Sequence, residues 1–180
     1  MRSPNPRRLD RTALWEYAVR ALAGRAHSAG ELRRKLERRA EQPGDVEDVL
    51  RQLKEYRYLD DRRFAESYAA ARLDQKFGQA RVVRDLRQRR VAPSVAEGTV
   101  QKVYRDVDET ALIEEWVRRK YRLTPREGLF QEDKEMASAY RRLLHAGFHS
   151  GNIIRVLKRF ARNPELLDSF EPPEEPLEDE

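Results

Sequence analysis

One pattern of apolar residues occurs three times along this chain, and it limits the fold more than any other feature. The first copy consists of Leu32, Leu36, Val46, Val49, Leu50 and Leu53. The second copy, 50 positions later, is Val82, Leu86, Ala96, Thr99, Val100 and Val103, and the third, 57 positions after that, is Ala139, Leu143, Ile153, Val156, Leu157 and Phe160. Separations of three, four and seven residues are typical of one face of an α-helix. The sequence therefore predicts an all-α protein built from one repeated helical unit.

An amphipathic segment precedes each copy, so each repeat is expected to hold three helices. These leading helices are predicted over roughly residues 10–25, 61–75 and 108–122, and a longer loop is predicted over 123–131. Three-helix units that contact mainly their neighbours form an elongated array. We predict a basic disordered arm over 1–9, helical repeats over 10–60, 61–107 and 108–162, and an acidic disordered tail over 163–180.

Polar residues at the expected helix starts agree with this division. Ser28 precedes Glu31 by three residues, which is the spacing of a capping box. Asp45 and Asp61 stand where a side-chain oxygen could accept hydrogen bonds from unpaired amides, and Pro93 suits the first turn of a helix.

The charge of the chain is divided unevenly between its body and its tail. The formal net charge is +5, but the eight acids after position 162 leave 37 basic and 24 acidic residues over positions 1–162, a net charge of +13. A body of this charge attracts polyanions, and arginine, which greatly outnumbers lysine, can pair with phosphate and stack on bases. Genomic base composition could account for the preference for arginine, but it does not account for the net charge.

Composition also excludes several classes of protein. The chain has no cysteine, which rules out disulfides and thiolate zinc sites, and no apolar run approaches the ~18–20 residues that span a bilayer. We expect a cytoplasmic protein without contact to a membrane.

The basic residues that could bind nucleic acid concentrate on the second helix of each repeat, with further groups near the ends of other helices. The candidate residues for binding nucleic acid or a nucleoprotein filament are Arg33, Arg34, Arg38, Arg39, Arg81, Arg84, Arg87, Arg89, Arg90, Arg118, Arg119, Lys120, Arg141, Arg142, Arg155, Lys158 and Arg159. Such a set could follow a phosphate backbone. The alternative is that these residues are only the solvated face of ordinary helices, but their recurrence at the repeat spacing favours binding.

Aromatic residues could add base stacking. Trp15, Phe64, Tyr68 and Trp116 fall on apolar faces, so core packing is the better interpretation for them. A second group lies near helix ends beside basic residues, where packing is favoured but stacking stays open; it comprises Tyr56, Tyr58, Tyr104 and Tyr121.

Signs of catalysis are weak. Asp60, Asp61 and Glu66 form the one compact acidic set, which a metal nuclease could use, but two acids before a helix are more simply caps. His145 and His149 lie four apart with Gly147 between them and have no third ligand nearby. We predict no catalytic residue, no metal site and no cofactor.

Three stretches of the chain are distinctive: residues 25–36 (RAHSAGELRRKL), 58–65 (YLDDRRFA) and 143–148 (LLHAGF). They resemble the RecX family of regulators of the RecA recombinase, and the resemblance covers about residues 13–160. It implies three three-helix repeats and a non-enzymatic protein of recombination, DNA repair and the SOS response. Such a protein would lie in the groove of the RecA–single-stranded-DNA filament and limit its extension, ATPase activity and strand exchange.

The chain departs from the family pattern between the second and third helices of a repeat. The family usually has a basic residue, a glycine and a hydrophobic residue there, whereas this chain has RAEQPG over residues 39–44 and RVA over 90–92. Gln79 also stands where proline is common in the family. We expect the turn geometry to differ at these places.

Three hypotheses of function follow. The first is a monomeric regulator of the RecA filament that contacts single-stranded DNA, with contact to double-stranded DNA left open. The alternatives are a general DNA- or RNA-binding protein or repressor that does not depend on RecA, and a helical scaffold for acidic proteins. The acidic tail could also fold over the basic surface and weaken its binding to DNA.

Overall fold

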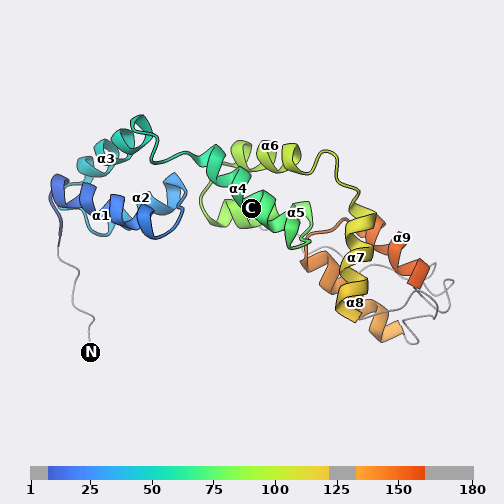
Figure 1. Ribbon diagram of the computed structural model, residues 1–180. Coiled ribbons are helices and arrows are strands. Elements are labelled where there is room, and N and C mark those ends of the chain that lie inside the picture. The colour runs from blue at the N-terminus through green and yellow to red at the C-terminus, as the bar shows by residue number, and fades with distance from the viewer. Residues whose placement is uncertain (1–7, 122–132, 161–180) are drawn as a thin grey trace, which may run out of the picture. The chain divides into compact units, whose positions relative to one another are not determined.

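The computed structural model describes residues 8–121 and 133–160, and every helix and turn below lies within them (Figure 1). The described part holds nine α-helices: α1 (Arg11–Gly24), α2 (Ala29–Glu37), α3 (Pro43–Glu55), α4 (Asp61–Asp74), α5 (Gln79–Gln88), α6 (Pro93–Val103), α7 (Glu109–Tyr121), α8 (Asp133–His145) and α9 (Ser150–Phe160). In these residues the one strand-like pairing is an isolated bridge between Leu9 and Ala40. The predicted all-α fold of three-helix repeats is confirmed. The predicted loop over 123–131, the tail over 163–180 and most of the arm lie outside the described residues.

The helices assemble into two compact units. The first unit comprises Met1–Ala71 and Val83–Val103, which contain α1, α2, α3, α6 and most of α4 and α5. The second comprises Arg72–Val82 and Tyr104–Glu180, which contain α7, α8, α9 and the segment between α4 and α5. The division of the chain into repeats over 10–60, 61–107 and 108–162 stays a prediction from the sequence.

The first unit has its main core among α1, α2 and α3. The residues of this core are Leu14, Ala18, Leu32, Leu36, Ala40, Val46, Val49, Leu50, Leu53 and Leu59. The chain before α1 is tied to the end of α2, because the amide of Leu9 donates to the carbonyl of Arg39 at 2.7 Å and Glu41 donates back to Leu9 at 2.9 Å. The apolar frame of the first repeat is thus the buried face, as the periodicity predicts.

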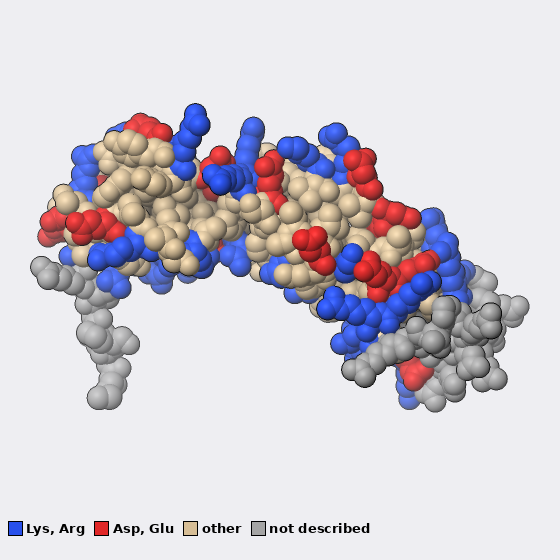
Figure 2. Space-filling view, in the orientation of Figure 1, with Lys and Arg blue, Asp and Glu red and all other residues tan. Residues whose placement is uncertain are grey.

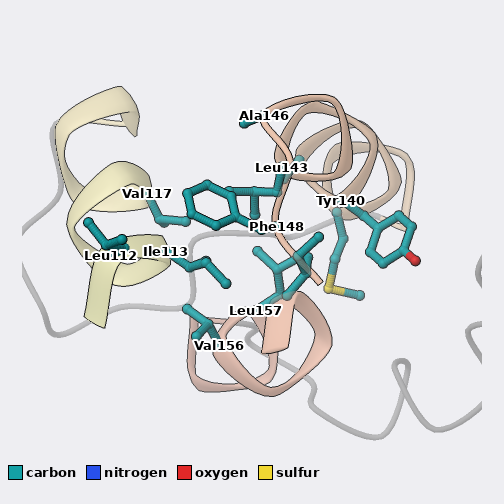
Figure 3. Close-up of a cluster of buried hydrophobic side chains, with 12 residues drawn as sticks. Leu112, Ile113, Val117, Tyr140, Leu143, Ala146, Phe148, Val156 and Leu157 are labelled. Atoms are coloured by element: carbon teal, nitrogen blue, oxygen red, sulfur yellow. The ribbon is translucent and has the colours of Figure 1, made fainter. Parts of the chain in front are cut away.

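The second unit has its core among α7, α8 and α9. Val117 and Ile113 of α7 point toward Phe148, which follows α8 (Figure 3), and Leu112 and Leu143 belong to the same core. The remaining buried members include Met136, Ala139, Tyr140, Ala146, Ile153, Val156 and Leu157. The apolar frame of the third repeat supplies part of this core.

The helix starts confirm some of the capping predictions and correct one. Ser28 accepts a hydrogen bond from the amide of Glu31 at 3.0 Å, as a cap of α2 does. Asp45 is not a cap, because α3 begins earlier, with Gln42 at the cap position and Pro43 in the first turn. Proline suits that position since its missing N–H would have no partner there. Pro93 begins α6, as predicted.

Several helices end in a turn with a residue in the left-handed conformation. Arg57, Lys76 and Arg90 have φ angles of 58°, 63° and 62°, and Gly147 has a φ of 90°. After Arg90 the amide of Val91 donates to the carbonyl of Leu86 at 3.1 Å, which is the hydrogen bond of a Schellman turn. Arginine therefore occupies at Arg90 a conformation that usually favours glycine. In the described part of the chain, no helix is long and apolar enough to cross a membrane.

Candidate nucleic-acid interface

Helix α2 presents basic side chains opposite its buried face. Leu32 and Leu36 are fully buried, whereas Arg33, Arg34 and Arg38 are exposed. Arg33 is paired with Glu47 of α3, and this hydrogen bond raises the pKa of the guanidinium. Arg34 and Arg38 have no ion pair with a described residue, so both guanidinium groups can meet an anion.

Arg39, just after α2, is held differently. Its guanidinium lies over the ring of Tyr17, 5.1 Å from the ring centre, and the side chain is half-buried. A cation that is committed to an aromatic face is less available to a phosphate.

In the first unit, α5 and the turn after it add a second set of basic residues. Arg84, Arg87 and Arg90 are exposed. Arg87 is paired with Glu97 of α6, whereas Arg84 and Arg90 have no ion pair with a described residue. The first unit therefore offers Arg34 and Arg38 on α2 together with Arg84 and Arg90 as cations for a polyanion.

Arg89 has a structural position, although it was predicted with the others as a binding residue. Its guanidinium lies 3.2 Å from Glu31 and 4.9 Å from the ring centre of Tyr68. Its carbonyl accepts a hydrogen bond from the hydroxyl of Ser28. The start of α2 therefore meets the end of α5, and we call this contact the first joint.

Close backbone packing also shapes the first joint. A Cβ atom at Gly30 would meet the Cβ of Arg90 and would lie 2.5 Å from its carbonyl oxygen, so only glycine fits without a shift. Asp61 accepts a hydrogen bond from the amide of Ala29 at 2.7 Å. Asp61 does satisfy an unpaired amide at a helix start, as predicted, but the helix is α2 and not its own.

Several ionisable side chains surround the first joint. His27 is 3 % exposed, and burial, followed by the charges of Arg25 and Lys35, lowers its pKa despite its contact with Glu31. Burial acts to raise the pKa of Glu31, but its hydrogen bond to Arg25 and the charges of Arg25 and Arg89 outweigh burial, and the pKa is lowered. The joint thus holds an ionised Glu31 between two arginines beside a neutral histidine.

The second unit contains a joint of the same kind, which we call the second joint. The amide of Gly78 donates to the carbonyl of Ala146 at 2.7 Å, and that of Ala80 donates to Gly147 at 3.2 Å. A Cβ atom at Gly78 would meet the carbonyl of Gly147 and lie 2.5 Å from the amide nitrogen of Phe148. Here the start of α5 meets the end of α8 through backbone atoms.

The predicted basic residues of the second unit are spread over α5, α7, α8 and α9. Arg81 lies over the ring of Phe77, 4.3 Å from its centre. The exposed residues of the set are Arg118, Arg119, Lys120, Arg141, Arg142, Arg155 and Arg159, and Lys158 is half-buried. Arg118 and Arg159 meet at Glu114, which brings α7 and α9 together, and Arg118 lies 3.8 Å from that carboxylate.

The surface of the molecule shows how cations and acids alternate. Figure 2 shows Lys and Arg side chains over both units, interrupted by Asp and Glu. This agrees with the ion pairs of Arg33, Arg87 and Arg159. A phosphate backbone therefore has to compete with internal carboxylates at part of the predicted set.

The acidic set before α4 has structural partners. Asp60 accepts hydrogen bonds from the amides of Arg62 and Arg63 at 2.9 and 3.0 Å, and Glu66 pairs with Lys102 at 3.0 Å. With Asp61 bound to Ala29, each carboxylate has a partner. Among the described residues, no group of three His, Asp or Glu could hold a metal ion.

The tyrosines that the sequence placed in one group differ in exposure in the structure. Tyr104 is 9 % exposed and donates its hydroxyl to the carbonyl of Phe77 at 2.8 Å, which is a packing role. Tyr56 and Tyr58 are 66 % and 60 % exposed. Their positions beside basic residues were noted in the sequence, but exposure was not predictable from them.

The repeat spacing carried a signal for the internal ion pairs that sequence reasoning missed. Glu47 and Glu97 are 50 positions apart, the same offset as the apolar frame, and each pairs with an arginine on the second helix of its own repeat. The spacing relates the two carboxylates but not the two arginines, since the positions 50 residues from Arg33 and Arg87 are Val83 and Glu37.

Sequence comparison identifies two domains of the chain. Residues 15–53 match the RecX first three-helix domain, and residues 60–99 match the RecX second three-helix domain. The first range ends two residues before the end of α3, and the second ends within α6.

Whole-chain relatives and solved structures agree. The regulatory protein RecX of Salmonella arizonae is 33 % identical over 171 residues, covering 89 % of this chain and 99 % of the relative. That of Deinococcus radiodurans is 37 % identical over 159 residues, covering 85 % of this chain and 70 % of the relative. The crystal structure of RecX from Lactobacillus salivarius has the same fold, with a TM-score of 0.67 at 16 % identity over 83 % of this chain and 96 % of the other. With 33 % identity over 99 % of one relative and 37 % identity over 70 % of the other, the chain belongs to the RecX family of regulatory proteins.

Proposed function

We propose that this protein regulates the RecA recombinase, mainly as an inhibitor, by binding in the groove of the RecA–single-stranded-DNA filament. Membership in the RecX family supports this function. The single structural observation that supports it most is the group of exposed arginines on α2 and around α5 that have no ion pair with a described residue: Arg34, Arg38, Arg84 and Arg90. Bound in the groove, the protein would limit filament extension, ATPase activity and strand exchange.

The first test is the single-stranded-DNA-dependent ATPase of the cognate RecA, with this protein far below one molecule per recombinase subunit and DNA in excess. A steep loss of ATPase activity is expected, because so little protein cannot sequester the DNA. Loss only when the protein coats the DNA would indicate the alternative function, a general nucleic-acid-binding protein. The net charge of +13 over positions 1–162 is the observation that favours this alternative.

The second test determines whether the exposed arginines of α2 contact the DNA. The variant Arg34→Ala/Arg38→Ala removes two cations that have no described ion pair, whereas Arg33 is already paired with Glu47. For a single strand, the slope of log K against log salt should become shallower by about 1.4, since each phosphate contact contributes about 0.7. The control is Arg20→Ala/Arg105→Ala, which makes the same charge change at two exposed sites, on α1 and just after α6. An equal change of slope in both variants would contradict the assignment to α2.

A further inference from the structure

A cluster of three aromatic rings lies in the first unit: Tyr56 and Tyr58 are exposed, and Trp15 is half-buried against the core. The ring centres of Trp15 and Tyr56 are 5.9 Å apart, and Tyr58 lies 6.4 Å from each of them. Tyr56 and Tyr58 are the large apolar residues with the greatest exposure in the described part of the chain, at 66 % and 60 %. Adjacent exposed aromatic rings offer apolar surface on which a partner can pack.

The turn after α3 holds these rings outward. The amides of Arg57 and Tyr58 donate to the carbonyls of Lys54 and Leu53 at 3.0 and 2.9 Å, and Leu59, the next residue, is buried. Arg57 takes a φ of 58°, which glycine would adopt at lower cost. The turn therefore exposes three successive residues, Tyr56, Arg57 and Tyr58, at some cost in backbone energy.

Two hollows flank the ring of Tyr58. One, of about 470 Å³, is lined by Tyr58, Phe64 and Tyr68 together with Arg57 and Arg63, among other residues. The other, also of about 470 Å³, is lined by Trp15, Tyr56 and Tyr58 with Arg11. Walls that combine aromatic side chains with a few charged groups suit a flat aromatic ligand.

We propose that the surface around Tyr58 is a stacking site for an unpaired base of single-stranded DNA, with Arg57 and Arg63 paired to the neighbouring phosphates. This inference rests on the proposed function and deepens it by locating where bases are held. A single strand is the occupant because it combines exposed flat bases with a regular negative charge, and the site combines exposed rings with arginines.

The charges of the site agree with this occupant. Arg57 and Arg63 are exposed and have no ion pair with a described residue. Asp60 is the acid of the hollow, and its Oδ1 accepts hydrogen bonds from the amides of Arg62 and Arg63 at the start of α4. Since the helix start offsets the carboxylate charge, the two guanidinium groups dominate the field at the site.

The experiment tests whether binding depends on the aromatic ring of Tyr58, on the size of its side chain and on the bases of the strand. The full-length wild type and the variants Tyr58→Phe, Tyr58→Leu and Tyr58→Ala are titrated into a fluorescent strand of 15 thymidylates and into an abasic strand with the same number of phosphates. Tyr58→Phe keeps the ring and should bind thymidylate like the wild type. Tyr58→Leu and Tyr58→Ala should weaken thymidylate binding by about 5- to 100-fold and leave abasic binding and the salt slope unchanged.

Other outcomes overturn the inference. Equal loss on both strands, or no loss on either, means that Tyr58 does not stack on a base. Loss of binding to the RecA filament with unchanged binding to the thymidylate strand means that the patch contacts protein.

Two controls complete the experiment. Circular dichroism compares the variants with the wild type, and Tyr56→Ala repeats the test at the second exposed ring should a Tyr58 variant fold poorly. The variant Arg34→Ala/Arg38→Ala is titrated in parallel. If this variant weakens binding while Tyr58→Ala does not, the proposed function is supported and the stacking site is refuted. If the wild type binds neither strand nor filament, both proposals are refuted.

Discussion

The two joints solve the same problem with different atoms. In the first joint the start of α2 meets the end of α5, and in the second the start of α5 meets the end of α8. In each joint a glycine allows the close approach. The first joint is held by side chains: the hydroxyl of Ser28, and Glu31 with its arginine partners. The second joint is held by backbone amides, those of Gly78 and Ala80.

Because of this difference, we expect the first joint to respond to pH and salt more than the second. Backbone hydrogen bonds depend little on pH or salt, whereas a network of carboxylate, guanidinium and imidazole depends on both. The chain has two tryptophans, and they offer one reporter for each unit, because Trp15 lies in the first and Trp116 in the second. Replacing either tryptophan by phenylalanine leaves the other as a fluorescent probe of its own unit.

The largest effect should come from filling the second joint. Gly78→Ala puts a Cβ atom against the backbone of Gly147, so α5 and α8 must move apart and two backbone hydrogen bonds weaken. We expect a loss of about 3 kcal/mol in the free energy of unfolding by urea, reported by Trp116. The matched control is Gly98→Ala, since a Cβ atom there meets nothing within 4 Å. It should stabilise α6 by roughly 0.5–1 kcal/mol; a similar loss at both sites would refute the role of close packing.

The next effect is at the first joint. Ser28→Ala removes the cap of α2 and leaves the carbonyl of Arg89 without its hydroxyl donor, and Ser28 is fully buried. The expected loss is about 2 kcal/mol, measured by urea unfolding with Trp15 as the reporter. Ser67→Ala, an exposed position on α4, is the control and should change stability little. A Ser28 variant as stable as this control would show that side chains do not hold the joint.

Acid should weaken the first joint more than the second. The pKa of His27 in the folded protein lies below its ordinary value of 6.5, so the unfolded chain takes up a proton first. The stability from His27 is therefore fully present above about pH 6.5 and is lost as the pH falls through the folded pKa. The lowered pKa of Glu31 adds a further loss at lower pH, below its ordinary 4.5.

The measurement is the urea midpoint between pH 8 and pH 5, followed separately through Trp15 and Trp116. The Trp15 midpoint should fall with pH by more than the Trp116 midpoint, and His27→Gln, which cannot take up a proton, should reduce that fall. If the two midpoints fall together in the wild type and in the variant, the joints do not differ in this respect.

The smallest effect should come from making the first joint resemble the second. Arg90→Gly places glycine at a φ of 62°, as Gly147 stands at 90° in the second joint. Relief of the left-handed strain should raise the free energy of unfolding by a few tenths to about 1 kcal/mol. The same variant should make the salt slope for single-stranded DNA shallower by about 0.7 if Arg90 contacts a phosphate. A loss of stability would mean that the Arg90 side chain itself supports the turn.

The helices could be predicted closely from the sequence because their signals are local. The predicted helices over 10–25, 61–75 and 108–122 correspond to Arg11–Gly24, Asp61–Asp74 and Glu109–Tyr121. The apolar period fixes the buried face, and the cap at Ser28 depends on a residue only three positions away.

The site could be predicted only as a set of basic residues. Arg89 and Arg90 are adjacent and alike in sequence, yet Arg89 is committed to Glu31 and Tyr68 whereas Arg90 is exposed. The difference arises from contacts with residues that are far away in the chain, such as Ser28, and no local pattern encodes such a pairing. For the same reason the exposure of Tyr58 and the burial of Tyr104 could not be distinguished.

The joints also determine where the protein's positive field originates. The start of a helix carries about half a positive charge and commonly binds phosphate through its free amides. Here the starts of α2 and α5 each face the negative end of another helix, and the amides of Ala29, Gly78 and Ala80 already have acceptors. These helix dipoles largely cancel one another at the joints. Under the proposed function, a polyanion would therefore meet exposed guanidinium groups rather than the helix starts at the two joints.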